Sequence, residues 1–233
     1  MSDLIDTTEM YLKTVYELTE EGITPLRARI AERLGHSGPT VSQTVARMAR
    51  DGLVVVSGDR HLELTELGLA KATRVMRKHR LAERLLTDVI GLDWEFVHEE
   101  ACRWEHVMSE RVERRLAALL DHPHFDPYGN PIPGLAEIGE TSTSEQFLDG
   151  VTSLLTVANA APGRLDDVVV ARLGEPIQPD VELLSRLAQA GIRPGVTVTV
   201  ERSPGVVTIA PPGAATVLDL PDDVARHIFV GNR

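Results

Sequence analysis

The chain is poor in cysteine and in long apolar runs. Its 233 residues contain one cysteine, so no disulfide can form within the chain. The longest apolar runs, such as Val54–Val56, are far too short to cross a bilayer. The N-terminal residues MSDLIDTTEM lack the basic and apolar regions of a signal peptide. We therefore expect a cytoplasmic protein with no membrane partner.

An overall excess of positive charge is also missing. Lys and Arg number 24 against 35 Asp and Glu, and the net charge of −11 argues against an unstructured polybasic nucleic-acid binder. Hydrophobic residues at 42% are typical of globular proteins, and the length fits one large domain or two to three compact ones. Residues 25–60 reverse the balance, because six arginines, Arg27 among them, stand there against three acidic residues. This region is either a solvated surface or a nucleic-acid interface.

The first 65 residues have the pattern of a winged helix-turn-helix domain. Asp6 can cap a first helix with Glu9 at its third position, which is a capping-box arrangement. Two short helices joined by the glycine-containing turn Gly35–Gly38 follow, and then a hairpin. The predicted ranges are helices over 7–21, 26–34 and 39–49 and strands over 53–56 and 61–64.

The predicted third helix carries side chains suited to DNA. A glutamine can bridge a base edge, whereas hydroxyl and guanidinium groups suit phosphates. The set comprises Pro39, Thr40, Ser42, Gln43, Thr44, Arg47 and Arg50. Arg60 at the hairpin tip would reach the adjacent DNA backbone. The alternative is a winged helix that contacts only protein.

The next predicted helix, from Thr65 or Glu66 to about Ile90, contains an imidazole and a carboxylate on its apolar face. Its apolar stripe consists of Ala72, Val75, Met76, Ala82, Leu86 and Val89. His79 and Glu83 lie on that stripe four residues apart, so their side chains meet side by side. The alternative is that His79 is a hydrogen-bonded core residue.

A second predicted helix, from Trp94 to about Leu120 with Asp93 as its cap, adds further metal-type donors. At 100° per residue its His98, Cys102, Glu105 and His106 fall within about a third of the circumference. Two imidazoles, a thiol and a carboxylate on one arc match a transition-metal site. The alternative is a partly exposed polar face. Met10 could add a thioether, although methionine at its spacing is more often a core residue.

Seven segments of the chain closely resemble the diphtheria toxin repressor and iron-dependent regulator family (DtxR/IdeR). They are DTTEMYL, PLRARIAERL, SGPTVSQTVARM, DGLVVV, VMRKHRLAERLLTD, HEEACRWEHVMSE and GNPIPGL. The similarity is nearly continuous over residues 1–137. It implies a winged-helix DNA-binding domain, a helical metal-binding and dimerisation domain, and a C-terminal SH3-like domain behind a variable linker.

The resemblance also implies roles for particular residues. The family's primary metal site matches Met10, Cys102, Glu105 and His106. Its ancillary site matches His79, Glu83 and His98, with Glu175 and Gln178 from the segment GEPIQ. Its recognition helix matches Ser37, Pro39, Thr40, Ser42 and Gln43, of which the first two would touch thymine methyls. An anion position of the family matches Arg80 and Asn130, but Asp126 replaces a serine there, and its carboxylate would repel an anion.

The C-terminal part has the pattern of a small β barrel. Short β-branched segments around 168–170, 196–200 and 205–209 predict strands, and 180–190 predicts a helix. The expected fold class is mainly α with a small all-β domain. The expected parts are a winged-helix domain over 1–65, a helical metal-binding and dimerisation domain over 66–140, a flexible linker over 141–164 and an SH3-like domain over 165–233.

Together these features predict a homodimeric transcriptional repressor rather than an enzyme. A divalent metal would act as corepressor at two sites per chain, and the dimer would bind palindromic double-stranded operator DNA of iron-homeostasis and uptake genes. The soft donors Met10 and Cys102 favour Fe²⁺, although Co²⁺, Ni²⁺, Mn²⁺ or Zn²⁺ could bind in vitro. An apolar line on the second predicted helix would form the dimer contact through Val97, Ala101, Trp104 and Met108.

Two alternatives remain open at this point. One is a manganese-responsive regulator of the same superfamily, in which harder carboxylates replace the sulfur donors. The other is a metallohydrolase that holds metal through His98, Glu105 and His106 and uses Glu83 as its base.

Overall fold

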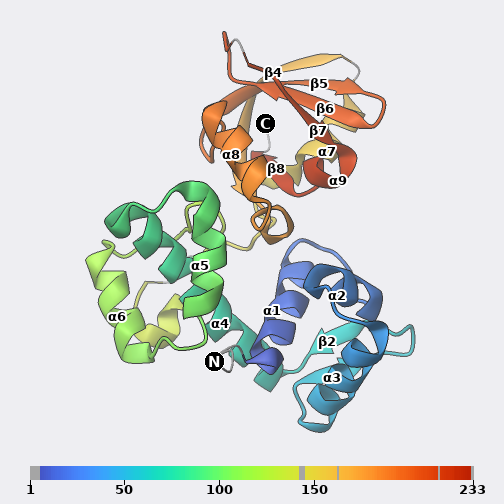
Figure 1. The fold of residues 1–233 in the computed structure, drawn as a ribbon, viewed down its shortest axis with the longest axis vertical. Helices are drawn as coiled ribbons and strands as arrows, with labels where there is room; N and C mark the ends of the chain where they lie inside the picture. The colour runs from blue at the N-terminus through green and yellow to red at the C-terminus, as the bar shows by residue number, and fades with distance from the viewer. Residues whose placement is uncertain (1–5, 142–144, 162, 215, 232–233) are drawn as a thin grey trace. The chain divides into compact units, whose positions relative to one another are not determined.

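The computed structural model describes residues 6–141, 145–161, 163–214 and 216–231 (Figure 1). The chain divides into two compact units. Unit 1 comprises residues 1–82, 101–124 and 132–147, and unit 2 comprises residues 83–100, 125–131 and 148–233. Within the described ranges, no helix has the length and apolar character that a membrane span requires.

Unit 1 begins with the expected winged helix-turn-helix. Its elements are α1 (Thr7–Glu20), α2 (Arg27–Leu34), α3 (Gly38–Arg50), β1 (Val54–Val56) and β2 (Leu62–Leu64). Asp6 caps α1 by accepting hydrogen bonds from the backbone N–H groups of Thr8 and Glu9, and the Ser37 hydroxyl caps α3. The strands β1 and β2 pair antiparallel, and a continuous apolar core joins helices and hairpin.

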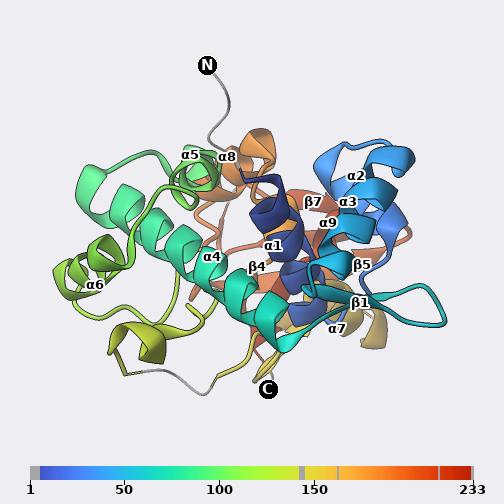
Figure 2. The same ribbon diagram turned by 90° about the horizontal axis from the view of Figure 1, so that it is seen from below.

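The long helix α4 (Glu66–Leu85) lies beside α1, as both ribbon views show (Figure 2). It is shorter than predicted, because the π-helical segment η1 (Leu86–Ile90) replaces its last turn. A π turn holds more residues than an α turn and rotates the following side chains away from the stripe. Val89, expected in the apolar stripe, is therefore 55% exposed. Gly91, with φ of 73°, ends the segment in the left-handed conformation.

The prediction of one helix over residues 94–120 is wrong. The chain instead forms η2 (Trp94–Phe96), α5 (Val97–Trp104), a turn over 105–107 and α6 (Glu110–Leu119). The side chains of Glu105 and His106 in this turn bind residues of α1 and α4, and the resulting tertiary contacts replace the helical continuation. The sequence offers no glycine or proline at this point that would signal the break.

A buried ion pair joins α4 to α6 within unit 1. Arg77 Nε lies 2.6 Å from Glu113 Oε2, and the two side chains are 2% and 1% exposed. Arg77 Nη1 also donates to the Gly134 carbonyl oxygen at 2.8 Å, and it lies 3.2 Å from Glu137. A small apolar core next to these helices contains Leu81, Ala117, Ile132, Leu135 and Ile138.

Unit 2 is built on a six-stranded antiparallel sheet in the order β3-β8-β4-β5-β6-β7 (Figure 1). The strands are β3 (Val151–Ser153), β4 (Arg164–Leu173), β5 (Thr197–Ser203), β6 (Val206–Ala210), β7 (Leu218–Pro221) and β8 (Ile228–Gly231). The short helices of unit 2 are α7 (Leu154–Ala160), η4 (Glu175–Ile177), α8 (Val181–Gln189) and α9 (Asp222–Ala225). One further short helix, η3 (Leu135–Ile138), belongs to unit 1.

Part of the expected flexible linker, 141–164, is regular structure. Strand β3 pairs with β8, with Val151 opposite Gly231, and α7 contacts both of these strands and β5. The side chains of Val151 and Leu154 are buried there. The linker's apolar residues therefore complete the C-terminal core, which the sequence pattern did not reveal.

Candidate metal centre and nucleic-acid interface

Helix α3 buries one face and exposes another. Val41, Val45 and Met48 belong to the apolar core, because they recur on the inner face. The outer face exposes the polar set predicted to meet DNA, namely Ser37, Pro39, Thr40, Ser42, Gln43, Arg47 and Arg50. Thr44 is the exception: it is 8% exposed, so its predicted place on the DNA face is wrong.

The remaining predicted DNA residues lie on α2 and on the hairpin. Arg60 is exposed at the hairpin tip, where it takes a φ of 71°. Arg27 is half-buried at the start of α2. The hydroxyl groups of Ser37 and Thr40 lie 2.8 Å apart and bond to each other, so each has one partner already in the protein.

A buried lysine lies at the centre of the metal-type donors of unit 1. Lys13, on α1, is 5% exposed. Its Nζ lies 2.9 Å from Glu105 Oε2, 3.0 Å from His79 Nδ1 and 3.6 Å from Cys102 Sγ. The sequence interpretation missed Lys13, although its position three residues after Met10, on the buried face of α1, was the available signal.

The carboxyl group of Glu105 is ionised beside Lys13 and His79. Burial would raise the pKa of its carboxyl group, but the positive charges of Lys13 and His79 and their hydrogen bonds outweigh burial and lower the pKa to about 2. The second histidine neighbour, His106, has its Nε2 3.4 Å from Glu105 Oε1. A stable carboxylate thus lies beside two imidazoles.

Glu9 orients His106. Its Oε2 lies 2.7 Å from His106 Nδ1, which leaves Nε2 on the side of Glu105. Burial would lower the pKa of His106, but the hydrogen bond to Glu9 and the charges of Glu105 and Glu9 outweigh it, so the pKa is raised. A carboxylate behind one ring nitrogen is the usual way in which proteins fix a histidine ligand.

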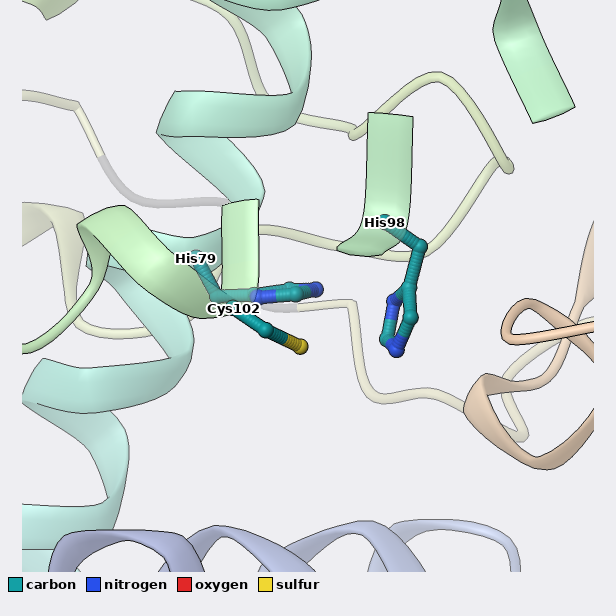
Figure 3. Close-up of side chains that lie close together, drawn as sticks. All are labelled: His79, His98 and Cys102. Carbon is teal, nitrogen blue, oxygen red and sulfur yellow. The ribbon is translucent and has the colours of Figure 1, made fainter. Parts of the chain in front are cut away.

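His79 and Cys102 also belong to this group. Their donor atoms lie within 4.8 Å of each other, and Figure 3 shows the His79 ring beside the Cys102 thiol. His79 Nδ1 is 2.6 Å from Glu105 Oε2, so this residue of the predicted ancillary set contacts the predicted primary set. Met10 instead packs against the apolar core of the winged helix.

A second group of donors lies within unit 2. His98 Nδ1 is 3.4 Å from Glu83 Oε1 and 3.5 Å from Glu175 Oε2, and all three side chains are buried. Gln178 is fully buried, its Nε2 donates to the Leu173 carbonyl oxygen at 2.9 Å, and its Oε1 has no hydrogen-bond partner among the described residues. Buried oxygens without a partner are costly unless a ligand satisfies them.

The residues at the family's anion position already have partners. Arg80 pairs with Glu20 within unit 1. Within unit 2, Asp126 accepts hydrogen bonds from the backbone N–H groups of Tyr128 and Asn130 and from Asn130 Nδ2. Asp126 therefore stabilises its own loop.

Both donor groups fit a divalent transition metal. The first combines the imidazoles of His79 and His106 with the Glu105 carboxylate and the Cys102 thiol, and the second combines the buried imidazole of His98 with the carboxylates of Glu83 and Glu175. The buried ammonium of Lys13 and the unpartnered oxygen of Gln178 both indicate places where a positive charge is favourable. A winged helix followed by such groups is typical of a metal-dependent DNA-binding protein.

The comparison with protein families agrees with this class. Residues 3–62 match "Iron dependent repressor, N-terminal DNA binding domain", residues 65–134 match "Iron dependent repressor, metal binding and dimerisation domain", and residues 156–232 match "FeoA domain". The chain belongs to the iron-dependent repressor family. It is therefore a metal-dependent, DNA-binding transcriptional repressor and not an enzyme, which overturns the metallohydrolase alternative.

The chain is similar to its relatives over nearly its whole length. It is 58% identical to the iron-dependent repressor IdeR of Mycobacterium tuberculosis, with 99% of each chain covered. It is 56% identical to the diphtheria toxin repressor of Corynebacterium efficiens, with 99% of this chain and 97% of that one covered. Among solved structures, a manganese-dependent transcriptional repressor in complex with manganese has a TM-score of 0.80 at 29% identity, covering 97% of this chain and 100% of that chain.

Proposed function

We propose that this protein is a homodimeric repressor that Fe²⁺ activates at two sites per chain for binding to palindromic operator DNA of iron-homeostasis and uptake genes. It would act in the cytoplasm. The primary site would be Met10, Cys102, Glu105 and His106, and the ancillary site His79, Glu83, His98, Glu175 and Gln178. The observation that carries the proposal is the buried nitrogen, oxygen and sulfur donor group around Lys13.

The proposed mechanism links the primary donors to α3, the helix predicted to contact DNA. A divalent ion held by these residues would supply positive charge that favours the approach of donors from different elements. Met10 lies on α1, which shares its core with α3, whereas Cys102, Glu105 and His106 follow one another from α5 into the turn. Moving Met10 out of that core to join the other donors would shift α1, and the DNA-competent conformer would gain population.

Two of the four residues in the apolar line expected from the sequence do not suit a dimer contact. Val97 and Ala101 are fully buried within the chain and cannot form a free surface. Large apolar side chains that are exposed in the second half of unit 1 are Val107, Val112 and Leu119, at 57%, 46% and 61% exposure. We assign the two-fold contact to this α6 surface.

Anaerobic operator binding, titrated separately with Fe²⁺ and Mn²⁺, tests the proposal. Replacing a primary donor by Cys102→Ala, Met10→Ala or Glu105→Gln should abolish metal-dependent binding while circular dichroism stays unchanged. Glu110→Gln is the matched control for Glu105→Gln, because Glu110 is an exposed carboxylate on α6. Unchanged Fe²⁺-dependent binding in the three donor variants would rule out the proposed primary site.

Manganese remains the second candidate metal. The similarity to a manganese-dependent repressor supports it, whereas the thiol of Cys102 favours Fe²⁺ because manganese prefers oxygen donors. Cys102→Asp should therefore shift the response from Fe²⁺ towards Mn²⁺. A wild-type protein that responds to Mn²⁺ at lower free concentration than to Fe²⁺ would establish the manganese alternative.

A further inference from the structure

The donor group of unit 1 contains a cation of the protein itself. The ammonium of Lys13 is within 3.6 Å of an oxygen of Glu105, a nitrogen of His79 and the sulfur of Cys102. We propose that Lys13 is an internal competitor for the primary metal site. Its ammonium holds the donors when no metal is bound and must leave before a divalent ion binds, so it raises the metal concentration at which the repressor responds. This inference rests on the proposed function.

An ammonium and a divalent ion cannot share these donors. A lysine ammonium has three donor hydrogens and no lone pair, so it bonds to the same lone pairs of Glu105 and Cys102 that a metal requires. Two positive charges beside one buried carboxylate also repel strongly, because the effective dielectric constant is low there. Lys13 therefore opposes metal binding at the atoms where metal would bind.

The structure also contains a second partner for the displaced ammonium. Glu17 lies one turn further along α1, with its Oε1 3.8 Å from Lys13 Nζ, and both side chains are 6% exposed. A buried charge without a partner would be costly, and Glu17 removes that cost. Side-chain rotation is enough to carry the ammonium from Glu105 to Glu17, since Lys13 already lies between them. Glu17 also pairs with Arg33 at 2.6 Å, which holds its carboxylate in place.

Anaerobic Co²⁺ titration of the full chain tests the competition. The near-ultraviolet thiolate-to-cobalt absorption reports binding at Cys102 specifically. Lys13→Leu removes the ammonium without adding a metal donor, and we expect the Kd for Co²⁺ to fall about tenfold or more. Lys71→Leu, the same change at an exposed lysine of α4, is the matched control and should leave the Kd unchanged. Lys13→Arg keeps the charge and should stay close to wild type.

A second readout uses thermal unfolding. In the presence of a chelator, Lys13→Leu should unfold at a lower temperature than wild type, because Glu105 loses its ammonium partner. On addition of Co²⁺ its unfolding temperature should rise by more than that of wild type. A residue with only a structural role would lower both temperatures equally.

A double-mutant cycle tests the role of Glu17. Glu17→Gln should weaken Co²⁺ binding about threefold or more in the wild-type background, because the displaced ammonium loses its second partner. In the Lys13→Leu background the same change should alter the Kd less than about twofold.

The outcomes separate this inference from the proposed function. A wild-type chain that shows no cobalt–thiolate absorption would overturn the proposed primary site. If wild type binds Co²⁺ and Lys13→Leu binds it equally well or more weakly, Lys13 is a supporting residue and the inference alone is overturned. If Lys13→Leu does not fold, Lys13→Gln compared with Lys13→Arg gives the same decision, with tighter binding expected for the neutral variant.

Discussion

The buried ion pair between Arg77 and Glu113 makes a sharp prediction about unit 1. Glu113→Gln keeps the volume of the side chain but removes the anion that faces a 2% exposed guanidinium. Breaking a buried pair by removing one partner costs about 3–5 kcal/mol. Glu137, which is 38% exposed and 3.2 Å from Arg77 Nη1, still supplies a nearby negative charge. We therefore expect a loss at the lower end, about 3 kcal/mol.

Helix α6 offers a matched control for this experiment. Glu110 pairs with Arg114 on the same helix, but both side chains are more than half exposed. Glu110→Gln should cost about 0.5 kcal/mol or less, because exposed ion pairs contribute little. Urea unfolding of the two variants and wild type, followed by circular dichroism, gives the comparison. Equal losses in Glu113→Gln and Glu110→Gln would refute the reasoning from burial.

Three further predictions concern the winged helix and its attachment to α4. A Cβ at Gly68 would lie 1.9 Å from the Leu53 carbonyl oxygen, so Gly68→Ala should lower the unfolding temperature by several degrees. Gly58→Ala is the control, because a Cβ there would lie in open space, and it should change the unfolding temperature little. Equal effects of the two variants in a thermal melt would contradict this packing. Arg47→Ala should reduce the salt slope of operator binding by about one. Gln43→Ala should change which operator sequences are preferred and leave that slope nearly unchanged, as anisotropy titrations at several salt concentrations would reveal.

The winged helix could be predicted from the sequence because its signals are local. Asp6 caps α1 and Ser37 caps α3 through side-chain oxygens, and the hairpin is formed by adjacent segments. Residue spacing also identified which positions of α3 face outward. Thr44 was misjudged because its hydroxyl suggested a surface role, whereas helical periodicity alone places it beside Val41 and Val45.

The candidate metal donors were predicted from their residue types, but their arrangement was not predicted. The single arc predicted for Cys102, Glu105 and His106 depended on a continuous helix, which the turn after Trp104 interrupts. That turn is held by partners far away in the sequence, such as Glu9 and Lys13, and no local pattern contains this information. Their roles as metal ligands remain predictions.

The Leu173 carbonyl oxygen accepts hydrogen bonds from the side-chain amide nitrogens of both Asn130 and Gln178. Neither amide can turn over, because an oxygen facing Leu173 would bring two acceptors together. The backbone carbonyl of residue 173 thus fixes the orientation of both side-chain amides. A side-chain substitution at position 173 would leave that carbonyl, and so the orientation, unchanged. Gln178 offers an acceptor and never a donor at its other end. The free end of this buried amide is therefore suited to a cation or a hydrogen-bond donor and unsuited to an anion.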